Sequence, residues 1–243
     1  MESNTYYLAY EERYRKVFGA GVERWGHSPD DALLLSILQR WVNDNNLRGK
    51  RVIEFACGEG ACGLILSKIG CGYRGVDIAP SAVEKAKAAL KDIQTAKVSQ
   101  LDMVHQSLGE TFDAALDVMG IHMLVTDADR INYLKNVYDS LISGSPVLFF
   151  RESYSLKAYE GKVDNFEEWK AISCCNYNEP EKRIVKCGDK EVEVFIPLVP
   201  ARTKSKSGYI REFQNAGFVV DKFIEMNLNH ECPFSASIFA HKP

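Results

Sequence analysis

The chain has 243 residues, of which 46% are hydrophobic and 26% are charged, and its formal net charge is −3. This composition is ordinary for a globular protein and argues against a disordered, collagen-like or coiled-coil chain. The balance of 30 basic against 33 acidic residues gives no reason to expect a nucleic-acid or membrane-surface partner. No apolar run reaches the ~18–20 residues that span a bilayer.

Cysteine usage and the N-terminus favour a reducing compartment. The seven cysteines are scattered without the spacing of a zinc site or a disulfide framework, so we expect neither. The first residues contain no apolar segment of a secretory signal. We therefore expect a cytoplasmic protein without a metal, and the sequence does not indicate its oligomeric state.

The N-terminal part is expected to be helical. Residues 5–20 have the pattern of an amphipathic helix rich in Tyr and basic residues. A second helix is predicted to begin at 28–31, where Ser28 can act as N-cap, Pro29 suits the first helical position and Asp31 favours the positive end of the dipole. Its apolar side chains then share one face: Leu34, Ile37, Leu38, Trp41 and Val42. We treat residues 1–46 as an N-terminal helical cap.

Residues 51–150 alternate between short apolar segments and helical patterns. Strands are predicted over 51–56, 73–78, 96–101, 112–119 and 146–150. Helices are predicted from the glycine-rich loop to about Ile69, from Pro80, and from Asp127 as N-cap. This alternation predicts a parallel, doubly wound sheet of the α/β class.

Residues 151–208 interrupt that alternation. A short helix over 166–172 is predicted, followed by a β-hairpin of 183–186 and 191–196 around the turn Cys187-Gly188-Asp189. The basic segment 202–206 is expected to be a solvated loop. A helix over 207–216 and strands over 218–226 and 235–241 end the chain. We expect one domain, residues 1–243, in which 151–208 form a small α/β lid insertion.

A glycine-rich loop carries the strongest signal for function. Gly58, Gly60 and Gly63 follow the first strand in the pattern G-x-G-x-x-G and open a helix, where the backbone or sugar of a ligand can approach the chain closely. Glu54 lies inside that first strand. Asp77 ends the second strand, where an acid can accept both hydroxyls of a ribose.

Together these residues resemble the class I S-adenosylmethionine-dependent methyltransferases of the small-molecule type. The first family motif, an acid followed by a glycine-rich turn, corresponds to residues 54–60, and the second-strand acid to Asp77. A third-strand acid corresponds to Asp102, and the fourth-strand motif to residues 112–119. The resemblance covers about residues 48–150 and 208–241. It implies a Rossmann-like, doubly wound seven-stranded sheet, mostly parallel, with the last strand antiparallel.

The resemblance also implies which residues contact the cofactor, S-adenosylmethionine, and its product S-adenosylhomocysteine. These are Tyr14, Trp25, Glu54, Ala56, Cys57, Gly58, Gly60, Asp77, Ile78, Asp102, Met103 and Asp117. A sulfonium cation beside Glu54 and Asp117 is electrostatically reasonable, and Asp102 would read the adenine amino group. Ala56 departs from the family, which usually has Gly at that position.

Other residues are candidates for the acceptor side. His122 follows the fourth strand, where the family borders the methyl group, and we expect it to act as a general base. The candidate substrate contacts are Tyr6, Tyr10, His122, Arg151 and Tyr154. Methyl transfer is an in-line displacement, in which alignment and exclusion of water supply much of the acceleration. We expect a metabolite or natural product as acceptor, with O, N, S or C as the methylated atom.

Each assignment has a structural alternative. Glu54 could bond only to neighbouring amides, Asp77 could serve as a helix cap, and a backbone group could hold His122. The G-x-G-x-x-G pattern also fits an NAD-dependent oxidoreductase. An intact cofactor site also fits a methyltransferase-like module that binds S-adenosylmethionine without transfer. Cofactor identity and turnover separate these alternatives from a methyltransferase.

Overall fold

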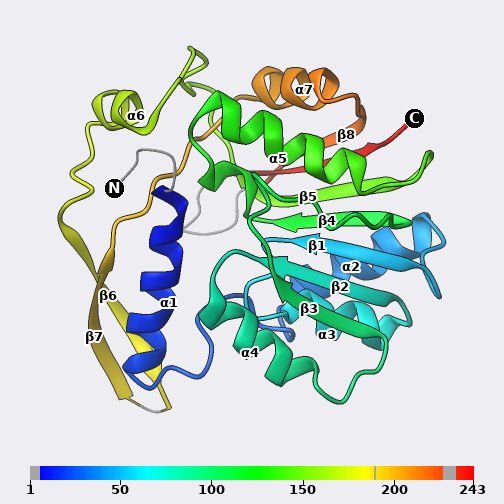
Figure 1. Ribbon diagram of the computed structural model, residues 1–243, viewed down its shortest axis with the longest axis horizontal. Coiled ribbons are helices and arrows are strands. Elements are labelled where there is room, and N and C mark those ends of the chain that lie inside the picture. The colour runs from blue at the N-terminus through cyan, green and yellow to red at the C-terminus, as the bar shows by residue number, and fades with distance from the viewer. Residues whose placement is uncertain (1–5, 189, 227–233) are drawn as a thin grey trace.

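The computed structural model describes residues 6–188, 190–226 and 234–243. A seven-stranded sheet forms its centre, in the order β3-β2-β1-β4-β5-β9-β8 (Figure 1). The strands are β1 (Arg51–Phe55), β2 (Gly72–Asp77), β3 (Ala96–Gln100), β4 (Ala114–Val118), β5 (Pro146–Ser153), β8 (Val219–Met226) and β9 (Ser235–His241). Strands β1 to β5 pair in parallel, and β9 is antiparallel to both of its neighbours. The predicted sheet with its antiparallel last strand is confirmed.

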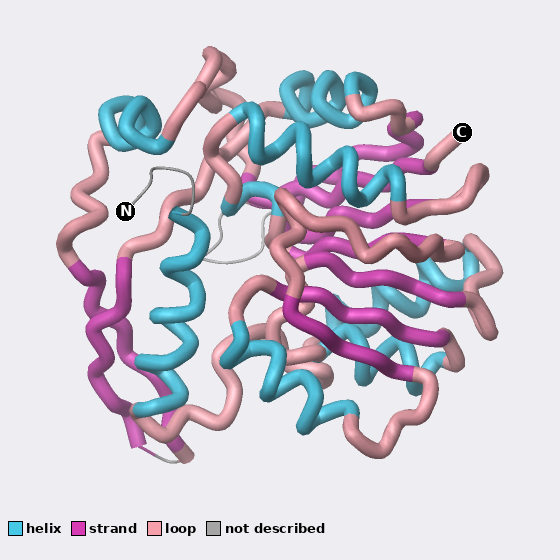
Figure 2. Tube along the Cα trace, viewed as in Figure 1, coloured by secondary structure: helices cyan, strands magenta, loops and turns pink. Residues whose placement is uncertain are grey.

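Helices cover both faces of this sheet (Figure 2). On one face lie α2 (Ala32–Asp44) and α3 (Ala61–Ile69), and on the other lie α5 (Asp127–Asp139) and α7 (Lys206–Asn215). Helix α4 (Pro80–Leu90) packs beside β3 and β2. In the described part of the chain, no helix is long and apolar enough to cross a membrane.

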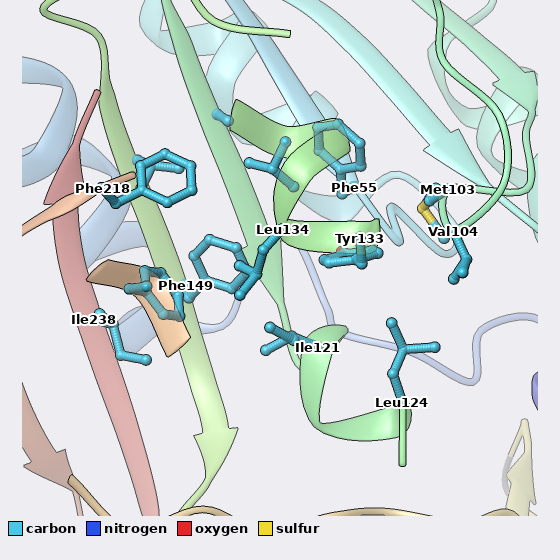
Figure 3. Packing of buried hydrophobic residues seen from close by; sticks show 14 of the residues in the cluster. Phe55, Met103, Val104, Ile121, Leu124, Tyr133, Leu134, Phe149, Phe218 and Ile238 are labelled. Carbon is cyan, nitrogen blue, oxygen red and sulfur yellow. The ribbon is translucent and has the colours of Figure 1, made fainter. Parts of the chain in front are cut away.

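The sheet divides the hydrophobic core in two, because alternate side chains of a strand point to opposite faces. Phe55 and Phe149 pack with Tyr133 and Leu134 of α5 (Figure 3), and the rings of Phe55 and Tyr133 meet edge to face at 5.7 Å. Val52, Leu116 and Leu148 instead pack with the apolar faces of α2 and α3. Both faces of the strands are therefore buried, which explains their nearly continuous apolar sequence.

Two helix starts differ from the prediction. The N-cap of α2 is Asp31, whose carboxylate accepts from two amides of the first turn at 2.9 and 3.0 Å, and not Ser28. The N-cap of α5 is Thr126, and Asp127 is the first helical residue. In both places several oxygen-bearing side chains precede the helix within a few residues. Spacing alone does not select among them, because each type is a favourable N-cap.

The N-terminal residues and the insertion lie together beyond the carboxyl ends of the parallel strands. After η1 (Tyr6–Leu8), α1 (Ala9–Gly19) stands between those ends and a hairpin of β6 (Pro180–Cys187) and β7 (Lys190–Pro197) (Figure 1). The insertion also contains α6 (Phe166–Ser173), as predicted. The hairpin is longer than predicted; its expected turn residue Asp189, and residues 1–5 of the expected cap, lie outside the described residues. A cluster of Val17, Val22, Val185, Val194 and Ile196 joins α1 to the hairpin.

Candidate active site

A cavity of about 900 Å³ opens at the carboxyl ends of the central strands and is covered by α1. Its place matches the position where open α/β sheets bind ligands, and its size suits a small molecule. Of the residues predicted from the sequence, twelve line it: Tyr10, Tyr14, Trp25, Glu54, Ala56, Cys57, Gly58, Asp77, Ile78, Asp102, Met103 and Arg151. Five others do not line it: Tyr6, Gly60, Asp117, His122 and Tyr154.

The glycine-rich loop brings the backbone to the cavity wall. Gly58 has a φ of +50°, and its amide donates to the Asp77 carboxylate at 2.8 Å. A Cβ on Gly58 would lie 3.1 Å from the Tyr14 hydroxyl, so a side chain would crowd the cavity. Gly60 serves the packing of helices instead, because a Cβ there would lie 3.1 Å from Ala86. This glycine therefore allows α3 to pack closely on α4.

Glu54 is a buried carboxyl on the cavity wall. It is 2% exposed, and the Tyr73 hydroxyl donates a hydrogen bond to it. Burial raises the pKa of Glu54 to about 8, and the bonds from Tyr73 and Cys62 only partly oppose this rise. Among the described residues, no basic side chain forms a salt bridge with Glu54. A cationic group of a ligand would therefore favour its ionised form.

Two further acids line the same wall from neighbouring strands. Both oxygens of Asp77 accept backbone amides, from Gly58 at 2.8 Å and Ala79 at 2.9 Å, and burial raises its pKa. The N-cap position of α4 belongs to Ala79, so Asp77 is not that cap. Each carboxylate oxygen retains a second lone pair that can accept a ligand hydroxyl. Asp102 accepts from the amide of Val104 at 3.0 Å and from the hydroxyl of Tyr7 at 3.3 Å.

Three residues with side chains adopt left-handed backbone conformations on the cavity wall. They are Ala56 after β1, Met119 after β4 and Arg151 within β5, with φ of +55°, +63° and +61°. This region costs a residue other than glycine of order 1–3 kcal/mol, and such strain gathers at functional sites. The conformation of Ala56 explains why glycine suits this position. At Arg151 the pairing of β5 with β9 is irregular, which turns the side chain into the cavity.

The structure places Asp117 and His122 behind the wall. Asp117 accepts from the amides of Gly120 and Ile121 at 2.7 and 3.0 Å and from the Tyr133 hydroxyl at 2.8 Å. Burial, together with the charge of Glu152, raises the pKa of Asp117. His122, in η2 (Ile121–Met123), has its Nδ1 2.7 Å from the fully buried Glu152. These side chains hold the turn after β4 and do not face the cavity.

The remaining two candidates, Tyr6 and Tyr154, and the basic segment also lie away from the cavity lining. The buried Tyr6 hydroxyl donates to Asp129 at 2.8 Å and accepts from the Val125 amide at 2.9 Å. Tyr154 packs edge-on against Phe223 with ring centres 5.6 Å apart. The expectation of a solvated basic loop is wrong, because Arg202 is fully buried and bonded to the Val125 and Gly161 carbonyls and to Asp127. A run of basic residues in the sequence does not reveal that one of them, Arg202, is buried against groups far away along the chain.

Some residues that line the cavity were not predicted as site residues. Glu59, inside the glycine-rich loop, accepts the amides of Trp25 and Gly26 at 2.8 and 2.6 Å. This contact fastens the segment before α2 to the cavity wall. In the sequence, the only feature that could have pointed to Glu59 is its position between two glycines of this loop. Other lining residues that were not predicted as site residues include Arg13, His27, Asp31 and Arg183.

A cluster of charged and polar side chains, Arg151, Asp31 and His27, lines the cavity beside β5. Arg151 forms a two-pronged ion pair with Asp31, at 2.8 and 3.1 Å, and its Nη1 lies 3.3 Å from Nδ1 of His27. Burial, and next the charge of Arg151, lowers the pKa of His27. Since arginine only donates, His27 accepts through Nδ1 in this arrangement. Asp31 therefore both caps α2 and positions Arg151.

Residues 52–144 match a family model described as a methyltransferase domain, and these residues span the acids and the glycine-rich loop described above. This part of the chain is similar to a methyltransferase domain. The match favours the resemblance to the S-adenosylmethionine-dependent methyltransferases over an NAD-dependent oxidoreductase.

Solved structures of other proteins share the fold of this chain. One is an S-adenosylmethionine-dependent methyltransferase from Clostridium acetobutylicum, with 14% identity, coverage of 97% of this chain and 98% of that chain, and a TM-score of 0.65. Another is magnesium protoporphyrin IX methyltransferase from Synechocystis PCC 6803, with 13% identity, coverage of 100% and 98%, and a TM-score of 0.64. At these identities the likeness concerns the fold alone.

The chain is also similar in sequence to a curated protein. The ribosomal protein L11 methyltransferase of Yersinia pseudotuberculosis is 27% identical over 157 residues, which are 61% of this chain and 51% of the relative. The chain thus spans about half the length of that relative.

Proposed function

We propose that this protein is a methyltransferase, which transfers the methyl group of S-adenosylmethionine to a small-molecule acceptor in the cavity beneath α1. The observation that carries the proposal is the meeting of three motif acids, Glu54, Asp77 and Asp102, on the wall of one covered cavity. They come from three different parts of the sequence and lie beside a loop whose backbone a ligand can approach. This arrangement suits a ligand with a cationic group, a diol and a purine amine.

Each acid fits one part of S-adenosylmethionine. Glu54 has no cationic partner in the described residues, and a ligand ammonium would favour its ionised form. Asp77 has free lone pairs for the two ribose hydroxyls, and Asp102 is placed to accept from the adenine amine. Tyr14 lies over Gly58 and can stabilise a sulfonium by cation–π attraction.

The chain promotes transfer by binding, orientation and exclusion of water. When bound, S-adenosylmethionine supplies an electrophilic methyl group on a sulfonium. The strand ends and the cap hold both reactants in one covered volume, so alignment replaces a bimolecular encounter. The described structure aims His122 at Glu152 and away from the cavity. We therefore assign His122 a structural role, and alignment the main catalytic role.

The cover over the cavity favours a small acceptor. Helix α1 and the hairpin stand across the strand ends, where a folded protein would have to reach the methyl group (Figure 1). The Yersinia relative is, by its name, a methyltransferase of a ribosomal protein. This chain spans about half of that relative, and a protein acceptor is the alternative that the experiment must distinguish.

A transfer assay with methyl-labelled S-adenosylmethionine tests the proposal. The purified protein is incubated with the low-molecular-mass fraction of a cell extract or with purified ribosomal protein L11. We expect the label to appear in small molecules and not in ribosomal protein L11. Label in L11 alone would contradict a small acceptor, and binding of S-adenosylmethionine without any transfer would indicate a non-catalytic module. The Asp77→Ala variant serves as the control for cofactor-dependent labelling.

A further inference from the structure

A second charged group lines the cavity where α1 meets the hairpin. Arg13 of α1 and Arg183 of β6 both contribute to the lining, and we call them the arginine pair. They share the single carboxylate of Glu181, which lies 2.5 Å from Arg13 and 3.1 Å from Arg183. Two guanidinium groups against one carboxylate leave one positive charge at this boundary.

Arg13 is largely buried between α1 and the hairpin. Its side chain is 13% exposed, and its buried Nε has no hydrogen-bond partner within the residues that the structure describes. Burial lowers the pKa of Arg13, which reflects the cost of keeping this cation away from water. An unpaired donor on a buried guanidinium is costly, and a bidentate carboxylate is the ligand that best matches its planar fork.

Neighbouring side chains add an apolar, aromatic surface. Tyr10 precedes Arg13 on α1, and Ile184 follows Arg183 on β6; both line the cavity. The motif acids for the cofactor come instead from the strand ends of the sheet. The arginine pair thus stands on the covering elements, apart from the wall that binds the cofactor in the proposed function.

We infer that the acceptor carries a carboxylate on an apolar or aromatic body, and that Arg13 and Arg183 bind this carboxylate. The inference rests on the proposed function, because it assigns the acceptor half of that cavity. S-Adenosylmethionine has a carboxylate of its own, which is the other source of the same chemistry. Arg151 also lines the cavity, and it comes from β5, a strand of the same sheet as the proposed cofactor wall.

Benzoate and its neutral analogue benzamide serve as probes. Calorimetry of the full chain saturated with S-adenosylhomocysteine measures the affinity of each probe. We expect benzoate to bind at least tenfold more tightly than benzamide. Arg183→Gln should bring this ratio close to one, whereas Glu181→Gln, which frees both arginines, should raise benzoate affinity several-fold. The matched control is Lys182→Gln, because Lys182 is exposed and pairs with Glu193 on the opposite face of the hairpin.

Several outcomes would overturn the inference. Equal binding of benzoate and benzamide to the unmodified protein is one, and an unchanged ratio in Arg183→Gln is another. Weaker S-adenosylhomocysteine binding in Arg183→Gln with the ratio retained would assign the arginine pair to the cofactor. Arg183 is about half exposed, so its substitution leaves the fold intact, and Arg13→Gln is the second variant. If the cofactor product does not bind at all, the proposed function fails, while the two probes can still be compared without it.

Discussion

At the scale of single residues, Asp77 is the acid whose loss tests the cofactor wall most directly. Its carboxylate already orders the Gly58 and Ala79 amides, and we expect it also to accept the ribose hydroxyls. Asp77→Ala should weaken S-adenosylmethionine binding by about 1–3 kcal/mol through the loss of charge-assisted hydrogen bonds. Isothermal calorimetry measures this change, with the exposed Asp92→Ala as control. Equal affinity of variant and unmodified protein would remove Asp77 from the site.

His122, in contrast to Asp77, is expected to affect stability and not cofactor binding. Its ring is the side chain paired with the buried Glu152, so His122→Ala leaves that carboxylate without a ring partner. We expect the free energy of unfolding to fall by about 2 kcal/mol or more, with cofactor affinity of the folded protein nearly unchanged. Urea unfolding and calorimetry measure the two quantities. A variant of unaltered stability with turnover reduced about a hundredfold would instead make His122 a catalytic base.

The sequence predicted residues of the cavity lining where they follow directly from the order of the strands, and it failed where packing decides which way a side chain points. Near the carboxyl ends of β1 and β2 lie Glu54, Gly58 and Asp77. A parallel sheet brings these strand ends together, so the order of the strands was enough to predict that the three residues meet. Asp117 lies in β4 and His122 follows that strand, yet their side chains turn inward to Tyr133 and Glu152, which are 16 and 30 positions further along the chain. No local pattern contains that information.

At the scale of elements, the contact between α1 and the hairpin holds the cover over the cavity. Val17 is fully buried in the small cluster with Val185 and Val194, and lies one turn after Arg13. Val17→Ala should cost about 2 kcal/mol of local stability, from the lost apolar area and the remaining cavity. Hydrogen exchange should then accelerate in residues 180–197 and not in β1 to β5. The control is Leu8→Ala, because Leu8 is exposed. An equal acceleration of exchange in all elements of the Val17→Ala variant would contradict this prediction.

The elements themselves were mostly predictable, because their signals are local. Buried strands appear as short apolar runs between glycines, and Pro80 occupies the first turn of α4 as expected. The N-caps of α2 and α5 were misplaced because neighbouring residues compete for the position. The placement of the hairpin along α1 depends on contacts between residues about 170 positions apart, such as Arg13 with Glu181. Periodicity does not report such contacts.

At the scale of the whole molecule, the stability should depend on pH through Glu54. Its pKa is about 8 in the folded chain against an ordinary 4.5, so the folded state keeps a proton that the unfolded state releases. Stability therefore falls as pH rises from about 5 to 8. Glu54→Gln should remove this part of the fall, on the order of 3 kcal/mol at pH 8. Urea unfolding at several pH values measures it, with the exposed Glu84→Gln as control. Parallel pH profiles for Glu54→Gln and the unmodified protein would contradict the assignment.

The central claim is that the covered cavity binds S-adenosylmethionine. Three motif acids, a glycine-rich loop and an aromatic cover meet at one place in the molecule, although they are spread from Tyr10 to Asp102 in the sequence. The most direct test is calorimetric titration of the unmodified protein with S-adenosylmethionine, S-adenosylhomocysteine and NAD. We predict dissociation constants in the micromolar range for the first two ligands and no binding of NAD. Binding of NAD alone, or of none of the three, would contradict the account.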